Sequence, residues 1–193
     1  MLAILASPTK LIVVLAWACF LFYWIFSVAG KNRSDRVFNL LRTIGLLCVV
    51  VLLFLFIGAG GIPDDVNPVL WHSILPVRVC ADAIAIISLV VLIRSRRILG
   101  ANWSSNVRFD RATELIKSGP YAYVRHPIYS GLIGLVLGTI IAYGRLVGVL
   151  IWVACVVALY LKSRKEDLLM LKKFNGEYLE YKSRTKALFP FVL

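Results

Sequence analysis

Residues 127–161 read PIYSGLIGLVLGTIIAYGRLVGVLIWVACVVALYL and contain one charged side chain, that of Arg145. Arg145 and the preceding Gly144 divide this stretch into two apolar runs, 127–144 and 146–161. As helices, runs of this length reach roughly 24–27 Å, close to the hydrocarbon thickness of a bilayer. Because the connection leaves no room for a wide loop, the sequence predicts a tight antiparallel hairpin of membrane helices.

Three further apolar runs precede the hairpin, at 11–29, 43–62 and 76–93. The chain of 193 residues is 60% hydrophobic and 17% charged, whereas a soluble domain is about 45–50% apolar and about 25% charged. This composition excludes a soluble enzyme and a disordered chain. The first run is too long for the core of a signal peptide and lacks an A-x-A-like cleavage site, so we expect it to be retained. The sequence therefore predicts an all-α integral membrane protein with five transmembrane helices.

The basic residues fall almost entirely on one side of this topology. With five alternating spans, 19 of the 22 Lys and Arg residues lie in the first loop, in the segment 94–125 and in the tail from Lys162. The positive-inside rule then places the N-terminus outside and the C-terminus in the cytoplasm. Contact with anionic lipid explains the formal net charge of +12. We therefore expect a multi-pass protein whose partner is the bilayer and not nucleic acid.

The sequence also lacks metal-binding patterns. Its four cysteines lie in apolar runs without a C-x-x-C pair, and neither His72 nor His126 belongs to an H-E-x-x-H motif. We therefore expect no metal. Arg78 and Asp82 are four residues apart and share one face of the third span. We interpret them as an ion pair within the bundle, with a proton or substrate path as the alternative.

Two polar clusters flank the hairpin. Arg125-His126 precedes Pro127 at the start of the fourth span, and Glu166-Asp167 follows the fifth. Because the connection is short, both feet of the hairpin must lie at the same cytoplasmic level. Proline is favoured at a first helical position, where free amides can bind an anion. The clusters predict a site at the membrane surface, while a basic flank and an amphipathic tail helix on the membrane are the simpler alternative.

These clusters resemble the isoprenylcysteine carboxyl methyltransferase family and the related phospholipid methyltransferases. The family pattern is G-x-Y-x-x-x-R-H-P-x-Y-x-G, a helical hairpin, then E-E-x-x-L-x-x-x-F-G-x-x-Y-x-x-Y and a proline, and it covers roughly residues 100–193. The first half is matched by Gly119, Tyr121, Arg125, His126, Pro127, Tyr129 and Gly131. The second half is matched by Glu166, Phe174, Tyr178, Tyr181 and Pro190, with Asp167, Met170 and Asn175 in place of glutamate, leucine and glycine.

The resemblance implies S-adenosylmethionine as methyl donor, bound without a Rossmann domain. It places the methyltransferase core in residues 100–193, after three N-terminal membrane helices in residues 1–99. The implied donor-binding residues are Asn106, Thr113, Glu114, Leu115, Ile116, Tyr121, His126, Pro127, Ile128, Tyr129 and Glu166. Arg125 is implied as catalytic. Lys162, where the family has arginine, and Arg164 are implied as substrate-binding.

The implied reaction transfers a methyl group to the C-terminal carboxylate of a prenylated cysteine and leaves S-adenosylhomocysteine. A carboxylate is already a nucleophile, so positioning matters more than a strong base. We expect the lipid acceptor to enter from the bilayer and the donor from the cytoplasm. Methylation of a phospholipid amine, which must first lose a proton, is the alternative within the same class. A non-catalytic lipid-binding scaffold is the alternative from another class.

Overall fold

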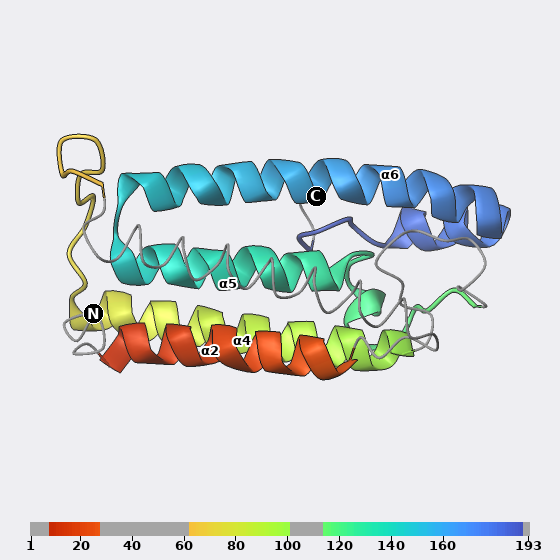
Figure 1. Cartoon of the computed structure of the whole chain (residues 1–193). Coiled ribbons are helices and arrows are strands. Elements are labelled where there is room, and N and C mark those ends of the chain that lie inside the picture. The colour runs from red at the N-terminus through yellow and green to blue at the C-terminus, as the bar shows by residue number, and fades with distance from the viewer. Residues whose placement is uncertain (1–7, 28–61, 101–113, 191–193) are drawn as a thin grey trace. The chain divides into compact units, whose positions relative to one another are not determined.

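The computed structural model describes residues 8–27, 62–100 and 114–190. Its helices are α2 (Pro8–Ser27), α4 (Leu75–Leu99), the short 3-10 helix η2 (Gly119–Ala122), α5 (Pro127–Tyr143) and α6 (Leu146–Arg184) (Figure 1). Within these described ranges there is no β-strand, only two isolated bridges. The predicted all-α fold is therefore confirmed for the described part of the chain.

Two of these helices, α4 and α6, are long and apolar enough to cross a membrane. The apolar helix Lys10–Trp24 within α2 is shorter, and so is α5. The predicted span 43–62 lies outside the described residues except for its last residue. The number of five spans and the orientation of the termini therefore stay predictions.

The chain divides into two compact units. The first comprises Met1–Ile86 with Leu135–Trp152, and the second comprises Ile87–Gly134 with Val153–Leu193. Helices α4, α5 and α6 each contribute one part to either unit. The predicted boundary at residue 100 does not coincide with a division between the compact units, and it stays a prediction.

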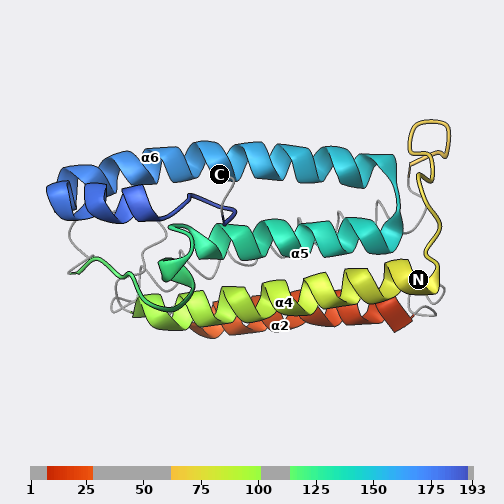
Figure 2. The same ribbon diagram turned by 180° about the vertical axis from the view of Figure 1, so that it is seen from behind.

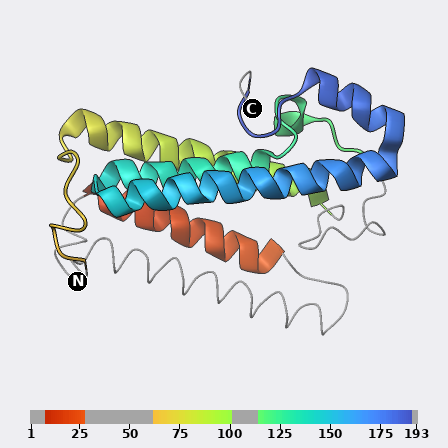
Figure 3. The same cartoon turned by 90° about the horizontal axis from the view of Figure 1, so that it is seen from above.

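In the first unit, α5 packs against both α2 and α4 (Figure 3). A Cβ at Gly138 would lie 3.0 Å from the carbonyl oxygen of Ala81 in α4. On the side of α2, Trp17 donates from Nε1 to Thr139 Oγ1 at 3.0 Å. Small residues let helices approach closely in a membrane, where helix association gains little from burying apolar surface. The glycine in α5 therefore permits its close contact with α4.

The connection between α5 and α6 is the two-residue turn that the sequence predicts (Figure 2). Gly144 has a φ of 65°, which glycine adopts at low cost. Asn67 is 1% exposed, and its Oδ1 accepts a hydrogen bond from the Val147 amide at 3.0 Å. Arg145 donates to the Asn67 carbonyl at 2.9 Å. The segment before α4 therefore caps the start of α6, where a helix leaves amides unpaired.

The predicted ion pair between Arg78 and Asp82 is wrong. Arg78 Nε donates to the Ser73 carbonyl at 2.7 Å and to Ser73 Oγ at 3.3 Å. Helical side chains lean toward the N-terminus of their helix, so Arg78 reaches the preceding turn and not the following one. One carboxylate oxygen of Asp82 is buried and has no hydrogen-bond partner within the described part of the chain.

In the second unit, α6 continues beyond the predicted span as one helix and then changes direction. The change occurs at Asn175, whose φ of 42° and ψ of −117° are not helical. Asparagine adopts positive φ more readily than other non-glycine residues, and it stands where the family pattern has glycine. After Asn175 the helix turns back, as Figure 3 shows. The sequence predicts the tail helix but not this reversal.

Candidate functional site

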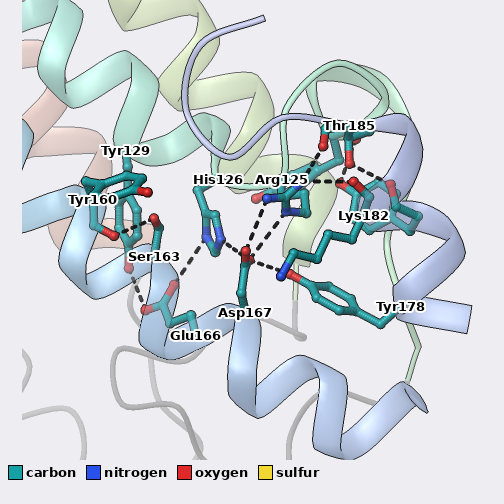
Figure 4. A network of polar contacts seen from close by, with 12 residues as sticks. Arg125, His126, Tyr129, Tyr160, Ser163, Glu166, Asp167, Tyr178, Lys182 and Thr185 are labelled. Carbon is teal, nitrogen blue, oxygen red and sulfur yellow. Dashed lines mark hydrogen bonds and ion pairs between the residues drawn. The ribbon is translucent and has the colours of Figure 1, made fainter. Parts of the chain in front are cut away.

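Two side chains from each foot of the hairpin meet in the second unit, as Figure 4 shows. Arg125 and His126 lie just before α5, and Glu166 and Asp167 are neighbours in α6. His126 Nε2 lies 2.7 Å from Asp167 Oδ1, and His126 Nδ1 lies 3.4 Å from Glu166 Oε2. The structure thus brings together the two clusters that flank the hairpin in the sequence.

His126 faces a carboxylate with each of its ring nitrogens. A neutral imidazole donates from only one nitrogen, whereas an imidazolium donates from both. Burial disfavours the charged ring, but the hydrogen bonds and charges of Asp167 and Glu166 outweigh burial and raise the pKa of His126. The geometry therefore favours an imidazolium near neutral pH, and an imidazolium has no lone pair with which to accept a proton.

Asp167 is buried and has three partners. Its side chain is 3% exposed. Arg125 donates to its two oxygens from Nη2 at 3.1 Å and from Nε at 3.4 Å, and the Tyr178 hydroxyl donates at 2.5 Å. Burial alone would raise the pKa of Asp167, but the hydrogen bonds from His126 and Tyr178 and the charge of Arg125 lower it well below its usual range. Asp167 is therefore an anion that links both basic residues to α6.

Glu166 lies on the more open side of the cluster, with a side chain 19% exposed. Its Oε1 accepts a hydrogen bond from the Tyr129 hydroxyl at 2.6 Å. The Tyr129 ring stacks on that of His126, with centroids 5.5 Å apart and planes 5° apart. A carboxylate offers about four acceptor sites, and His126 and Tyr129 take one each. Glu166 can therefore accept further hydrogen bonds from a ligand.

The two residues implied as substrate-binding point to different places. The Lys162 ammonium lies 5.2 Å from the centroid of the Tyr129 ring, beside the cluster. Arg164 instead donates to the Tyr160 hydroxyl at 3.3 Å. Residues two apart on a helix do not share a face. Of these two cations, Lys162 is therefore the one that a ligand at Glu166 would meet.

The start of α5 is less open to an anion than the sequence indicates. The amides of Arg125 and His126 donate to the carbonyls of Lys186 and Ala187, at 2.8 and 3.0 Å. Two amides of the first helical turn donate back to the carbonyl of His126. The chain after α6 therefore occupies donors that the sequence leaves free for a carboxylate of the methyl donor.

The other implied donor-binding residues are less closely tied to the cluster. Tyr121 is 6% exposed, and its carbonyl accepts a hydrogen bond from the Tyr181 hydroxyl at 2.7 Å. Within the described ranges, no hydrogen bond or ion pair joins the cluster to the Glu114 side chain; Leu115 and Ile116 precede η2, and Pro127 and Ile128 follow His126 as the first residues of α5. Asn106 and Thr113 lie outside the described residues.

Four members of this network are absent from the donor-binding, catalytic and substrate-binding residues that the resemblance implies: Asp167, Tyr178, Lys182 and Thr185. Consecutive helical residues point about 100° apart, so Glu166 and Asp167 could have been assigned separate partners. Tyr178 reaches Asp167 because of the reversal at Asn175, which helical periodicity does not reveal. Thr185 contributes its backbone carbonyl to Arg125, and a carbonyl has no signal in the sequence.

A sequence model of the phospholipid methyltransferase family matches residues 77–177, just over half of the chain. The matched range contains all four side chains of the cluster. The chain belongs to the phospholipid methyltransferase family. No match was found among curated proteins.

Family membership makes this chain a membrane-associated methyltransferase. Methyltransferases of such families generally use S-adenosylmethionine, and a lipid-type acceptor fits a member of this family. Among the described residues, no three His, Cys, Asp or Glu side chains are grouped as ligands of a metal ion would be.

Proposed function

We propose that this protein transfers a methyl group from S-adenosylmethionine to the C-terminal carboxylate of a prenylated cysteine, beside His126, Tyr129 and Glu166. The observation that carries the proposal is His126 held between two carboxylates with Lys162 beside them. In such a site Lys162 supplies a positive charge for an anionic acceptor, and His126, as an imidazolium, cannot act as a base. Family membership supplies the reaction class, and the motif residues support the acceptor.

Glu166 is the main donor-binding residue in this proposal. S-adenosylmethionine, when bound, supplies an electrophilic methyl group on a sulfonium. The free acceptor sites of Glu166 suit the ammonium or the ribose hydroxyls of this donor. Tyr129 fixes the orientation of the Glu166 carboxylate through a hydrogen bond, and His126 does so through an ion pair at 3.4 Å. Arg125 is engaged by Asp167 and by two backbone carbonyls, so its role is to position His126 rather than to touch the reacting atoms.

A carboxylate acceptor suits these side chains better than an amine does. A carboxylate oxygen forms the new C–O bond as the C–S bond breaks, and no proton has to move. A phospholipid amine arrives as an ammonium and must lose a proton first. His126 faces a carboxylate with each ring nitrogen, so as an imidazolium it cannot take that proton. Lys162 offers the positive partner that an anion needs when it leaves water.

Calorimetry with S-adenosylhomocysteine on the full chain tests the donor site. We expect His126→Ala and Glu166→Gln each to weaken binding by roughly ten- to a hundredfold, because a charge-assisted hydrogen bond contributes about 1.5–3 kcal/mol. Glu180→Gln is the matched control, since Glu180 is exposed on the same helix and pairs with Arg184. Unchanged affinity in both cluster variants would remove the donor from this place.

Transfer of a radiolabelled methyl group tests the acceptor, with an S-farnesylcysteine analogue and phosphatidylethanolamine offered in parallel. Label on the farnesylcysteine that is released by base marks an ester. We expect Lys162→Ala to raise the KM for the acceptor or to lower kcat with little change in donor affinity. Lys162→Arg should retain activity because the guanidinium can pair with a carboxylate. Lys172→Ala, an exposed change outside the cluster, is the control.

The second candidate function is N-methylation of a phospholipid, which the family description favours. In that case base-stable label appears in phosphatidylethanolamine, and Lys162→Ala has no effect on acceptor use. A lipid-binding scaffold would bind no S-adenosylhomocysteine at all.

A further inference from the structure

Residues 185–188, which follow α6, lie alongside the residues that precede α5. Lys186 pairs with Val124 as a parallel bridge. The carbonyl of Leu188 accepts a hydrogen bond from Ser130 Oγ, and the Leu188 side chain is 0% exposed. We call residues 185–188 the C-terminal strap. It is anchored by a buried side chain and by backbone hydrogen bonds.

The strap holds Arg125 and His126 from the side opposite to Asp167. Its Lys186 and Ala187 carbonyls accept hydrogen bonds from the amides of Arg125 and His126, at 2.8 and 3.0 Å. The Arg125 guanidinium donates from Nη1 to the Thr185 carbonyl and, at 3.3 Å, to the carbonyl of Lys182 just before the strap. The same guanidinium reaches Asp167 with its other nitrogens, as Figure 4 shows.

His126 needs this support because it precedes the first residue of α5. The amide of a residue at this position has no partner within the helix, so α5 alone does not fix its peptide plane. The ring must nevertheless reach Glu166 and Asp167 at once while it stacks on Tyr129. Sites of this kind work only when their side chains are held within about 0.5 Å of the required geometry.

We propose that the C-terminal strap is part of the donor site, where its backbone positions His126 between Glu166 and Asp167. The proposal rests on the proposed function, since it concerns donor binding at Glu166. The strap touches no reacting atom and is therefore a positioning element. Loosening it should free the His126 ring from one of its two carboxylates and weaken donor binding, while the helices remain folded.

The chain has two histidines, so His126 can be observed selectively. In the full chain carrying His72→Gln, the imidazole nitrogens of His126 are the only ones in a nitrogen-15 spectrum. We expect both to be protonated at neutral pH and to stay so as the pH rises past the ordinary range for histidine. In Leu188→Ala the ring should lose its proton at lower pH. Affinity for S-adenosylhomocysteine should fall about tenfold, which corresponds to about 1.4 kcal/mol.

Leu179→Ala is the matched control, because Leu179 lies in the same C-terminal region and is 53% exposed. It should change neither the spectrum nor the affinity. A chain ending at Arg184 lacks the strap altogether. In it, His126 should lose its proton at a still lower pH, and affinity for S-adenosylhomocysteine should fall further than in Leu188→Ala. If circular dichroism shows that this chain does not fold, the test rests on Leu188→Ala and Ser130→Ala. Ser130→Ala removes the hydrogen bond to the Leu188 carbonyl and should change the His126 spectrum and the affinity in the same direction as Leu188→Ala.

An unchanged His126 spectrum and unchanged affinity in Leu188→Ala overturn the proposal. If the wild-type chain binds no S-adenosylhomocysteine, the proposed function fails, and the strap is judged on the His126 spectrum alone. In that case a spectrum altered by Leu188→Ala supports the positioning of His126, and an unaltered one refutes it.

Discussion

Glu166 and Asp167 are adjacent carboxylates with different surroundings. Asp167 is 3% exposed and is surrounded by Arg125, His126 and Tyr178, whereas Glu166 is 19% exposed and retains acceptor sites. Neighbouring helical positions point in different directions, so one carboxylate faces the protein and the other faces the more open side. Asp167 should therefore matter mainly for stability, and Glu166 mainly for binding.

We expect Asp167→Ala to lower the free energy of unfolding by about 3–5 kcal/mol, because it leaves a buried guanidinium without its anion. Arg125 is 8% exposed, so water cannot replace the lost partner. Glu166→Ala removes a partly exposed carboxylate and should cost about 1 kcal/mol or less. Thermal unfolding in detergent measures both variants. Equal losses would contradict the division of roles between the two carboxylates.

The raised pKa of His126 makes stability depend on pH. The folded chain retains a proton that the unfolded chain releases above about pH 6.5. The stability that His126 contributes is therefore complete below that pH and is lost as the pH rises through the folded pKa. Asp167, whose pKa is lowered, contributes stability that is complete above its unfolded pKa and is lost as the pH falls from there through its folded pKa.

The midpoint temperature of thermal unfolding of the wild-type chain should therefore fall as the pH rises above about 6.5. In His126→Gln this fall should be smaller, because the variant has no proton to lose at this position. His72→Gln, which changes the histidine outside the cluster, should show the same slope of unfolding temperature against pH as the wild type. Identical slopes in all three chains would show that His126 is not stabilised as an imidazolium.

The meeting of residues 126 and 166 could be inferred from the sequence, because a two-residue turn between two helices leaves their far ends adjacent. The partners of Arg125 could not be inferred in the same way. Its contacts with residues 182 and 185 are made to backbone carbonyls, which every residue possesses. Arg78 shows the opposite failure, since spacing of four residues indicated Asp82 while the side chain reaches Ser73.

At the scale of elements, α6 departs most from the sequence prediction. Its membrane part and its tail form one helix, and the direction changes at Asn175. Met170, Phe174, Tyr178 and Tyr181 keep helical spacing across this position, so periodicity gives no sign of a break. The family pattern has glycine there, which adopts such a conformation at low cost. Asn175 therefore holds a backbone conformation that is strained for an asparagine.

We expect Asn175→Gly to raise the free energy of unfolding by about 1 kcal/mol, because relief of the positive φ exceeds the added freedom of the unfolded chain. Asn175→Ala should lower it, since alanine tolerates positive φ less well than asparagine. Thermal unfolding of the two variants measures the difference. Lys172→Ala, an exposed change in the helical residues before Asn175, is the control. If the Asn175→Gly chain were less stable than the wild type, the backbone at Asn175 would not be strained.

At the scale of the whole molecule, composition and charge placement carry the prediction of a membrane protein. Family membership and two helices long enough to span a bilayer agree with it. The number of spans depends on the run 43–62, which the described residues leave out except for its end. Composition shows that such a run is apolar enough to cross, but only its flanks indicate on which side of the membrane each end lies.

Those flanks give a direct test of orientation. Asp65 follows the second predicted span and Lys172 follows the fifth, and both are exposed. With 19 of the 22 basic residues on one side, that side should be cytoplasmic. A cysteine at Asp65→Cys should react with an impermeant thiol reagent added outside intact cells. One at Lys172→Cys should react only after permeabilisation. The native cysteines must first be replaced, since Cys19 and Cys80 are themselves exposed. Five spans require these two positions to lie on opposite sides, so equal labelling of both would exclude five spans, and the reversed pattern would exclude the orientation alone.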